Sequence, residues 1–169
     1  MVWHIPLTQG YVALVDDADY AMVGAHKWRV ELTRTGKVHR VVRTTQPDGW
    51  RGRKVSVSLH RVLMDAPSGI EVDHVDRDPL NNQRSNLRFA TRQQNNQNTG
   101  IRSDNTSGFK GVHFDTNQGL WVARIRGGDG RMFLGRFSDP FDAAQAYDAA
   151  ARQVFGEFAS LNFSESRPA

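Results

Sequence analysis

A polar stretch, residues 96–107, divides this chain into two parts. It is built mainly from Asn, Thr, Gly and Ser and has little apolar periodicity, which is typical of a linker. A chain of 169 residues has room for one medium domain or two small ones. The polar interruption favours two small domains, each with a modest core.

Composition excludes several classes of protein. Hydrophobic residues make up 38% of the chain and charged residues 24%, and cysteine is absent. No apolar run approaches the roughly 18 residues that a membrane span requires, and disulfides and cysteine-ligated zinc are excluded. Residues 1–6 lack the basic and apolar regions of a secretory signal. We therefore expect a cytoplasmic protein with no membrane partner.

The charges are segregated along the chain. The net charge of +4 by itself is only weak evidence for an acidic partner. Residues 34–61, however, contain eight basic residues and a single acid, Asp48. Between residues 138 and 163 acidic residues predominate instead. This segregation suits a protein that faces a polyanion, although solvated charge alone would give the same pattern.

The N-terminal part has the pattern of a β-rich segment. Asp16, Asp17 and Asp19 are suited to capping a short helix that ends near Ala25. A turn is expected at residues 47–49 and a second helix at residues 59–64. Strands are expected at residues 11–15, 27–33, 38–45 and 55–57, with a hairpin across residues 35–36.

The C-terminal part predicts three strands followed by one helix. The strands are expected at residues 109–114, 120–126 and 131–137, separated by turns at 117–119 and 127–130. The helix is expected from Pro140 to about Phe155. Asp139 is suited to the N-cap, Pro140 to the first turn and Gly156 to the C-terminal stop.

The side chains of these elements predict two different faces for the sheet. Alternation on the second strand places Trp121, Ala123 and Ile125 on one face. Arg124 and Arg126 lie on the other, where they would be offered to a partner. The helix presents apolar residues at helical spacing toward the sheet: Phe141, Ala144, Tyr147, Ala151, Val154 and Phe155.

Asp73 and His74 form a pair at the end of a probable strand. A carboxylate binds a hard divalent cation, and a neutral imidazole accepts a proton from water. Three downstream asparagines could orient a histidine or ligate a metal through their amide oxygens: Asn82, Asn86 and Asn95. The stretch 91–94 matches a capping box, which places Thr91 at an N-cap and Asn95 on the first helical turn.

Each of these residues alone has an ordinary structural interpretation. An Asp-His pair is commonly a turn or a surface pair, and Asn86 could simply fill a turn position. The combination of His60, Asp73-His74, Asn86 and the capped Asn95 favours a site. The remaining N-terminal histidines have no comparable context and are interpreted as strand or surface residues: His4, His26 and His39.

The segments 59–62, 71–76, 81–82, 86–88 and 91–95 resemble the HNH endonuclease family, and more narrowly its phage and intron homing endonucleases. Their active site is a ββα-metal fold. The resemblance implies that Asp73 is a metal ligand and His74 the general base. It further implies that Asn86 holds the loop and orients His74, and that Asn95 completes the metal site. Many relatives have His where this chain has Asn95.

The implied reaction is hydrolysis of a DNA phosphodiester. A water deprotonated by His74 attacks the phosphate, and a single Mg²⁺ or Mn²⁺ stabilises the developing charge. One metal site implies that one strand is cut at a time. The resemblance also implies products with 5′-phosphate and 3′-hydroxyl ends.

Residues 108–163 resemble a second family, the APETALA-two or ethylene-response-factor DNA-binding domain of plants. The segments 107–112, 121–126, 134–137, 146–148 and 161–163 carry this likeness. In that family the sheet lies in the major groove of DNA. The positions that match its DNA-binding residues are Lys110, His113, Arg124, Arg126, Arg131, Phe133 and Arg136. His113, Asp115, Arg124 and Phe133 depart from the plant pattern, so the plant target sequence does not carry over.

We therefore predict an α+β protein with four regions. Residues 1–58 form the β-rich part of the nuclease domain, 59–98 the ββα-metal core, 99–107 a linker, and 108–163 a three-stranded antiparallel sheet packed on one helix. The predicted function is a metal-dependent HNH endonuclease of the homing type that acts on double-stranded DNA, with a monomer favoured. The alternatives are a non-catalytic DNA-binding regulator with a decayed nuclease fold, a nuclease for RNA or foreign DNA, and a C-terminal module that only scaffolds or dimerises.

Overall fold

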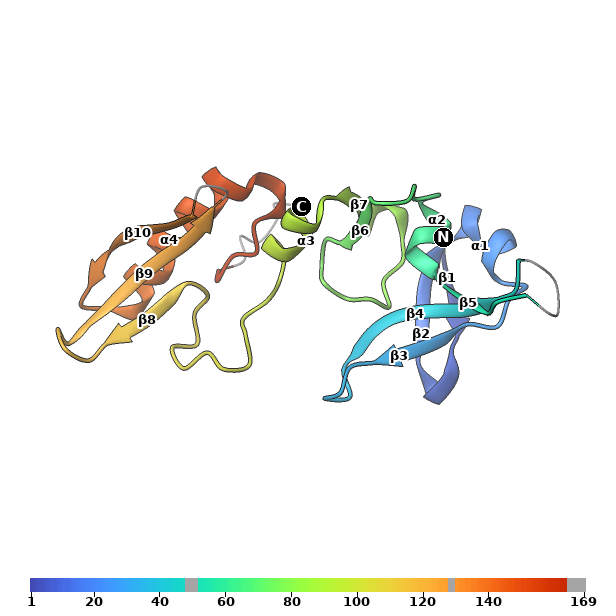
Figure 1. The fold of residues 1–169 in the computed structure, drawn as a ribbon, viewed down its shortest axis with the longest axis horizontal. Helices are drawn as coiled ribbons and strands as arrows, with labels where there is room; N and C mark the ends of the chain where they lie inside the picture. The colour runs from blue at the N-terminus through green and yellow to red at the C-terminus, as the bar shows by residue number, and fades with distance from the viewer. Residues whose placement is uncertain (48–51, 128–129, 164–169) are drawn as a thin grey trace. The chain divides into compact units, whose positions relative to one another are not determined.

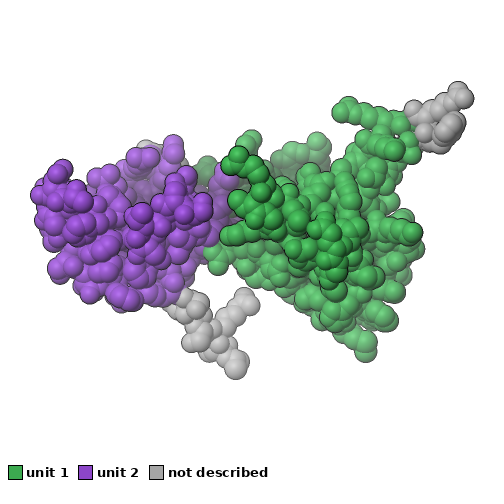
Figure 2. Space-filling model, turned by 90° about the horizontal axis from the view of Figure 1, so that it is seen from below, with its two compact units in different colours: residues 1–95 green, residues 96–169 purple. Residues whose placement is uncertain are grey.

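The computed structural model describes residues 1–47, 52–127 and 130–163. The chain divides into two compact units, residues 1–95 and 96–169 (Figure 2). The expected α+β class is confirmed, since small antiparallel sheets accompany a few helices (Figure 1). The turns expected at residues 47–49 and 127–130 include residues outside the described ranges. In those ranges, no helix is long and apolar enough to cross a membrane.

The first unit is built from short antiparallel strands and short helices (Figure 1). The hairpin expected across residues 35–36 is confirmed as β3–β4, whereas β1 was not among the expected strands. The elements are β1 (Val2–Pro6), β2 (Val12–Asp16), α1 (Asp17–Val23), β3 (Arg29–Leu32), β4 (Val38–Thr45), β5 (Val55–Ser58), α2 (Leu59–Leu63), β6 (Glu71–His74) and β7 (Leu87–Ala90), with 3-10 turns at Thr8–Gly10 and Arg84–Asn86; α3 (Arg92–Gln97) begins in this unit.

One hydrophobic core joins the N-terminal strands to the β6–β7 ribbon. Its members come from β1, β2, α1, β4, α2, β6 and β7, together with Trp28 just before β3, and are all almost fully buried. The ribbon is therefore held from one side by the N-terminal sheets, because burial of apolar surface is the main stabilising term. The core residues are Ile5, Ala13, Val15, Val23, Trp28, Val41, Leu59, Leu63, Val72 and Leu87.

The carboxylates at the start of α1 do not all cap it as expected. Asp16 stands at the N-cap position but makes no side-chain capping bond. Its two carboxylate oxygens instead accept from Gln83 Nε2 and Arg84 N, at 3.2 and 2.7 Å. Asp19 is only 2% exposed and receives two bonds of 2.8 Å from the Arg84 guanidinium. These carboxylates tie a distant loop to α1, a role that the local sequence does not reveal.

The second unit is a three-stranded antiparallel sheet with one helix packed against it. The strands are β8 (Val112–Asp115), β9 (Leu120–Gly127) and β10 (Gly130–Phe137), with β9 in the centre. Helix α4 (Pro140–Phe155) follows, then a 3-10 turn, Gly156–Phe158. The expected N-cap is confirmed, because the Asp139 carboxylate accepts from Phe141 N at 2.6 Å.

Helix α4 buries a stripe of small residues and one tyrosine. Ala143, Ala144 and Ala151 are fully buried, as is nearly all of Tyr147, so the helix lies close to the sheet. The expectation was wrong for Phe141 and Val154, which are 55% and 39% exposed. Phe141 instead contacts the rings of Phe109 and Phe163.

Strand β10 contains a β-bulge. Phe133 pairs with Arg124 and Gly135 pairs with Ala123, so Leu134 is an extra residue between them. Leu134 packs into the core beneath the sheet. The bulge shifts the alternation by one residue, and Arg136 therefore emerges on the same face as Arg131 and Phe133.

Candidate active site and DNA-binding face

The β6–β7 ribbon sends the predicted catalytic pair to opposite faces. β6 and β7 are antiparallel, with Asp73 opposite Arg88 and His74 opposite Leu87. Because side chains alternate along a strand, His74 shares a face with Val72, which lies in the core. Asp73 shares the other face with Glu71. The Asp73 carboxylate and the His74 imidazole can therefore act on one substrate only at the end of β6, where the strand ends and the loop begins.

His74 is held by two neighbours on the core side of the ribbon. Its Nε2 lies 3.3 Å from Asn82 Oδ1, and its ring meets the ring of His60 edge to face, with centroids 5.1 Å apart. Burial lowers the pKa of His74, although the hydrogen bond to Asn82 and the nearby carboxylates, Asp76 foremost, oppose that shift. The imidazole is thus neutral at pH 7, as a general base requires.

His60 comes from α2, directly after β5. Burial, followed by the proximity of His74, lowers the pKa of His60 to about 3. Within the described part of the chain, its buried Nδ1 has no hydrogen-bond partner. His60 is therefore a neutral ring beside His74 that restricts its orientation and adds no positive charge.

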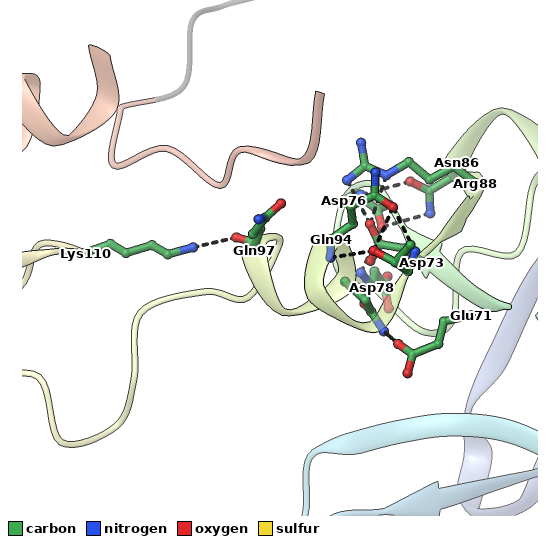
Figure 3. Close-up of polar contacts among 11 residues, drawn as sticks. Glu71, Asp73, Asp76, Asp78, Asn86, Arg88, Gln94, Gln97 and Lys110 are labelled. Atoms are coloured by element: carbon green, nitrogen blue, oxygen red, sulfur yellow. Dashed lines mark hydrogen bonds and ion pairs between the residues drawn. The ribbon is translucent and has the colours of Figure 1, made fainter. Parts of the chain in front are cut away.

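Asp73 and Asn95 each have a partner that the sequence analysis did not identify. Arg88 donates to Asp73 Oδ2 from Nε at 2.9 Å and from Nη2 at 2.8 Å. Asn95 Nδ2 donates to Glu71 Oε2 at 2.6 Å. Because Glu71 and Asp73 share a face, Asn95 lies on the Asp73 side of the ribbon. Figure 3 shows Glu71, Asp73 and Arg88 gathered beside α3.

The capping box of α3 forms as expected and holds Asn95 in place. Thr91 Oγ1 accepts from Gln94 N at 3.2 Å, and Thr91 N donates to Gln94 Oε1 at 2.8 Å. Asn95 N donates to the Thr91 carbonyl at 3.0 Å. Two orphan donors at the helix start are thereby satisfied.

The donor atoms on this face are of the type that a hard divalent cation prefers. Asp73 offers carboxylate oxygens and Asn95 an amide oxygen, both suited to Mg²⁺ or Mn²⁺. Since the Asn95 nitrogen is directed to Glu71, its oxygen is the atom that can face a cation. Counting His, Cys, Asp and Glu over the described residues, no group of three is placed to hold a metal. The oxygen atoms of Asp73 and Asn95 are therefore of the kind that binds a divalent cation. Arg88 would compete with that cation for the Asp73 carboxylate.

The loop between β6 and β7 is held by its own polar groups. Asn86 Oδ1 accepts from Asp76 N at 3.0 Å, and Asn86 Nδ2 donates to Asp76 Oδ1 and to the Asn81 carbonyl, both at 2.8 Å. Asn81 Nδ2 donates to Asp76 Oδ2 at 2.7 Å. Asn86 thus links Asp76 to Asn81 within the loop. The asparagine that contacts His74 Nε2 is Asn82.

The same loop is also tied to strand β2. Leu14 N donates to the Leu80 carbonyl and Asn82 N to the Leu14 carbonyl, each at 2.8 Å. Together with the bonds from Asp16 and Asp19 to residues 83–84, these contacts fix the loop from the N-terminal part of the unit. The sequence carried no signal for them, because their partners are more than 60 residues apart.

In the second unit, the outer face of the sheet gathers most of the predicted DNA-binding residues. Arg124 and Arg126 lie on β9, opposite Phe133 and Arg131 of β10. His113 and Arg136 flank Val122 on either side. A shallow cavity of about 390 Å³ lies on this surface, lined by residues that include His113, Arg124, Arg126 and Arg131. The arrangement is a broad cationic surface with aromatic groups.

Lys110, one of the predicted DNA-binding residues, makes hydrogen bonds within the chain. Its Nζ donates to the carbonyls of Gln97 and Thr99, at 2.8 and 2.6 Å. Its backbone N donates to Asn162 Oδ1 at 2.6 Å, and Asn162 is bound in turn to the buried Asp148. Lys110 thus holds the chain that leads into the sheet.

Comparison with known proteins finds similar proteins for both parts of the chain. A profile of the HNH endonuclease family matches residues 65–97. An uncharacterised HNH endonuclease of Acanthamoeba polyphaga mimivirus is 38% identical over 96 residues, 57% of this chain and 49% of that protein. Protein 3.8 of Escherichia phage T7 is 30% identical over 93 residues, 55% of this chain and 76% of that protein.

The C-terminal region is similar to plant proteins instead. Dehydration-responsive element-binding protein 2C of Arabidopsis thaliana is 51% identical over 49 residues, 28% of this chain and 14% of that protein. The chain spans about half the length of the mimiviral relative and a small part of the plant one.

The HNH profile thus matches the part of the first unit that holds the β6–β7 ribbon, its loop and α3, and the plant proteins match the unit with the arginine-bearing sheet. The chain belongs to the HNH endonuclease family, and its C-terminal region is homologous to the APETALA-two/ethylene-response-factor domains.

Proposed function

We propose that this protein is a metal-dependent endonuclease that hydrolyses phosphodiester bonds of duplex DNA, cutting one strand at a time. The observation that carries the proposal is the neutral, partly buried His74 at the end of β6, next in the chain to Asp73, whose side of the ribbon also holds Asn95. HNH nucleases generally depend on divalent metals. The proposal includes a phage or intron homing role, which the family resemblance implies, and a cytoplasmic location.

In this proposal Asp73 and Asn95 would hold a single Mg²⁺ or Mn²⁺. When bound, the cation would supply positive charge at the phosphate and the leaving oxygen. The protein contributes the proton acceptor, because His74 is neutral and takes the proton of the attacking water. The water oxygen bonds to phosphorus as the bond from phosphorus to the 3′ oxygen breaks, and that oxygen leaves as a 3′-hydroxyl after taking a proton from solvent.

The outer face of the C-terminal sheet would bind the duplex. His113, Arg124, Arg126, Arg131, Phe133 and Arg136 are the residues that we assign to this contact. Arginine pairs with guanine edges in the major groove and with phosphates, and the side chains on this face suit both. Linkage to a second DNA-binding unit raises the effective concentration of the nuclease at its substrate, so neither unit needs tight binding alone.

A supercoiled-plasmid assay tests the nuclease. The wild-type chain should convert plasmid to the nicked form with Mg²⁺ or Mn²⁺ and should stop when a chelator is added. His74→Ala should lose on the order of 10²–10⁴-fold in rate, the usual effect of removing a general base. His4→Ala is the matched control, since His4 is exposed on β1. Nicking that survives either chelation or His74→Ala contradicts the proposal.

One observation favours a second candidate function. Arg88 binds the Asp73 carboxylate through two nitrogens, and such a pair is what a decayed metal site would contain. The second candidate is a DNA-binding regulator that does not cut. It predicts tight duplex binding in a gel-shift titration, with no metal-dependent nicking by the same preparation.

A further inference from the structure

A neutral histidine has two ring nitrogens, and only one of them can accept a proton. The other carries the hydrogen, and its hydrogen-bond partner decides which nitrogen that is. For His74 the partner at Nε2 is the side-chain amide of Asn82, at 3.3 Å. The end of that amide that faces the ring therefore determines which nitrogen acts as the base.

The orientation of the Asn82 amide follows from its second contact. Its other end lies 2.9 Å from the Pro79 carbonyl oxygen. A carbonyl oxygen only accepts hydrogen bonds, so the Asn82 group beside it must be the NH₂. The amide oxygen is consequently the atom that faces His74.

Asn82 is also one of the most deeply buried side chains of the unit. It is 0% exposed, and its backbone N donates to the Leu14 carbonyl of β2 at 2.8 Å. A buried amide of this kind cannot rotate without leaving two polar groups unsatisfied, which is unfavourable because those groups have already lost their bonds to water. The oxygen therefore stays directed at the imidazole.

We propose that Asn82 is a positioning residue that holds the hydrogen of His74 on Nε2 and thereby makes Nδ1 the proton acceptor of the nuclease. The inference rests on the proposed function and assigns to Asn82 the orienting part that the family resemblance implied for Asn86. Asn86 is engaged with the loop through Asp76 and Asn81.

The same contact favours the protonated state that forms during the reaction. When water gives its proton to Nδ1, the ring becomes positively charged and keeps its hydrogen on Nε2. The bond from Nε2 to the Asn82 oxygen then becomes charge-assisted and stronger. Asn82 thus acts on the base in both of its protonation states.

The tautomer of His74 can be measured directly in the full-length wild-type chain with Mg²⁺ present. Nitrogen-15-labelled histidine gives separate signals for protonated and unprotonated ring nitrogens, and the His74 signals are assigned by their disappearance in His74→Gln. We expect the hydrogen on Nε2. A hydrogen found predominantly on Nδ1 overturns the inference, and this test does not require any Asn82 variant to fold.

Substitutions of Asn82 then connect the tautomer to activity. Asn82→Leu removes the acceptor and should give mixed tautomers, with kcat for nicking reduced on the order of 10²–10⁴-fold and KM unchanged. Asn82→Asp retains an acceptor oxygen and should keep the hydrogen on Nε2. Asn81→Ala is the matched control, because Asn81 binds Asp76 rather than the imidazole, and it should leave the tautomer unchanged.

These outcomes separate the inference from the proposed function. A wild-type chain that nicks DNA with the hydrogen on Nδ1 overturns the inference alone. A wild-type chain that has the hydrogen on Nε2 but never nicks overturns the proposed function, and with it the catalytic meaning of the contact. Equal kcat in a folded Asn82→Leu and in wild type also overturns the positioning role.

Discussion

Gly111 is the position where we expect one methyl group to disrupt the C-terminal unit. Its φ is +77°, and an added Cβ would lie 2.0 Å from Tyr147 Cδ2 and 2.8 Å from the Arg124 carbonyl oxygen. Tyr147 is a buried residue of α4, and the carbonyl belongs to the central strand. Neither neighbour can move without disturbing the contact between helix and sheet.

Two contributions set the expected cost of Gly111→Ala. A residue with a Cβ in the left-handed region costs roughly 1–2 kcal/mol. Forcing extra volume into a packed site costs about 1–3 kcal/mol more. The free energy of unfolding of the C-terminal unit should thus fall by about 2–5 kcal/mol, a large part of the stability of a typical small domain.

Gly108→Ala is the matched control. Gly108 also has a φ of +77°, but nothing lies within 4 Å of its added Cβ. It should show only the backbone cost, roughly 1–2 kcal/mol. The difference between the two variants isolates the contact with Tyr147 and the strand.

Hydrogen exchange of the full-length variants measures both effects. Peptides from β9 report the C-terminal unit, and peptides from β4 report the N-terminal unit as an internal reference. We expect Gly111→Ala to lose protection in β9 while β4 stays protected. Equal loss of protection in Gly108→Ala and Gly111→Ala would refute the reasoning, since it would mean that the close approach to Tyr147 costs nothing.

Three further predictions concern the site and the DNA-binding face. Replacing Arg124 and Arg126 with Ala should weaken duplex binding in a gel-shift titration and reduce its salt slope by about one for each phosphate that is no longer neutralised; unchanged affinity would remove the DNA-binding role of the sheet. The pKa of His60 is about 3 in the folded chain, against an ordinary value of 6.5, so the unfolded chain binds the extra proton and stability decreases as pH falls from 6.5 toward 3. The decrease should reach about 2 kcal/mol at pH 5 in urea unfolding, and His60→Leu should flatten this dependence. Glu71→Ala should release Asn95 and weaken Mn²⁺ binding in calorimetry by about 10–100-fold, whereas an unchanged affinity would show that Glu71 does not orient Asn95.

Some elements were predictable because their signals are local. Asp139, Pro140 and Gly156 mark the two ends of α4 within the chain itself, and the helix has the predicted bounds. The α3 capping box is equally local, since its two partners are three residues apart. Backbone groups at helix ends need partners close in sequence, which is why such motifs can be recognised without a structure.

Strand β1 could not be predicted in the same way. Of its five residues only Ile5 is buried, so it has no alternating hydrophobic pattern. It exists because it pairs with β2 along its whole length. A strand with little buried surface depends on its neighbour, and the neighbour is a property of the fold.

The DNA-binding face also depends on the tertiary structure, through the bulge in β10. Simple alternation would place Arg136 on the face opposite Arg131. The extra residue Leu134 reverses the alternation because its side chain fills the core against α4. The cationic face is therefore completed by a packing requirement on the other side of the sheet.

The amino-acid sequence by itself determined the two-part organisation, the ends of the longest helix and the set of polar residues from which the candidate site is built, because these depend on neighbours along the chain. Only the tertiary structure decided how those residues are paired: Asn82 with His74, Arg88 with Asp73, and Glu71 with Asn95. The physical reason is that a hydrogen bond requires two groups at about 3 Å, and strand pairing and core packing bring together groups that are far apart along the chain.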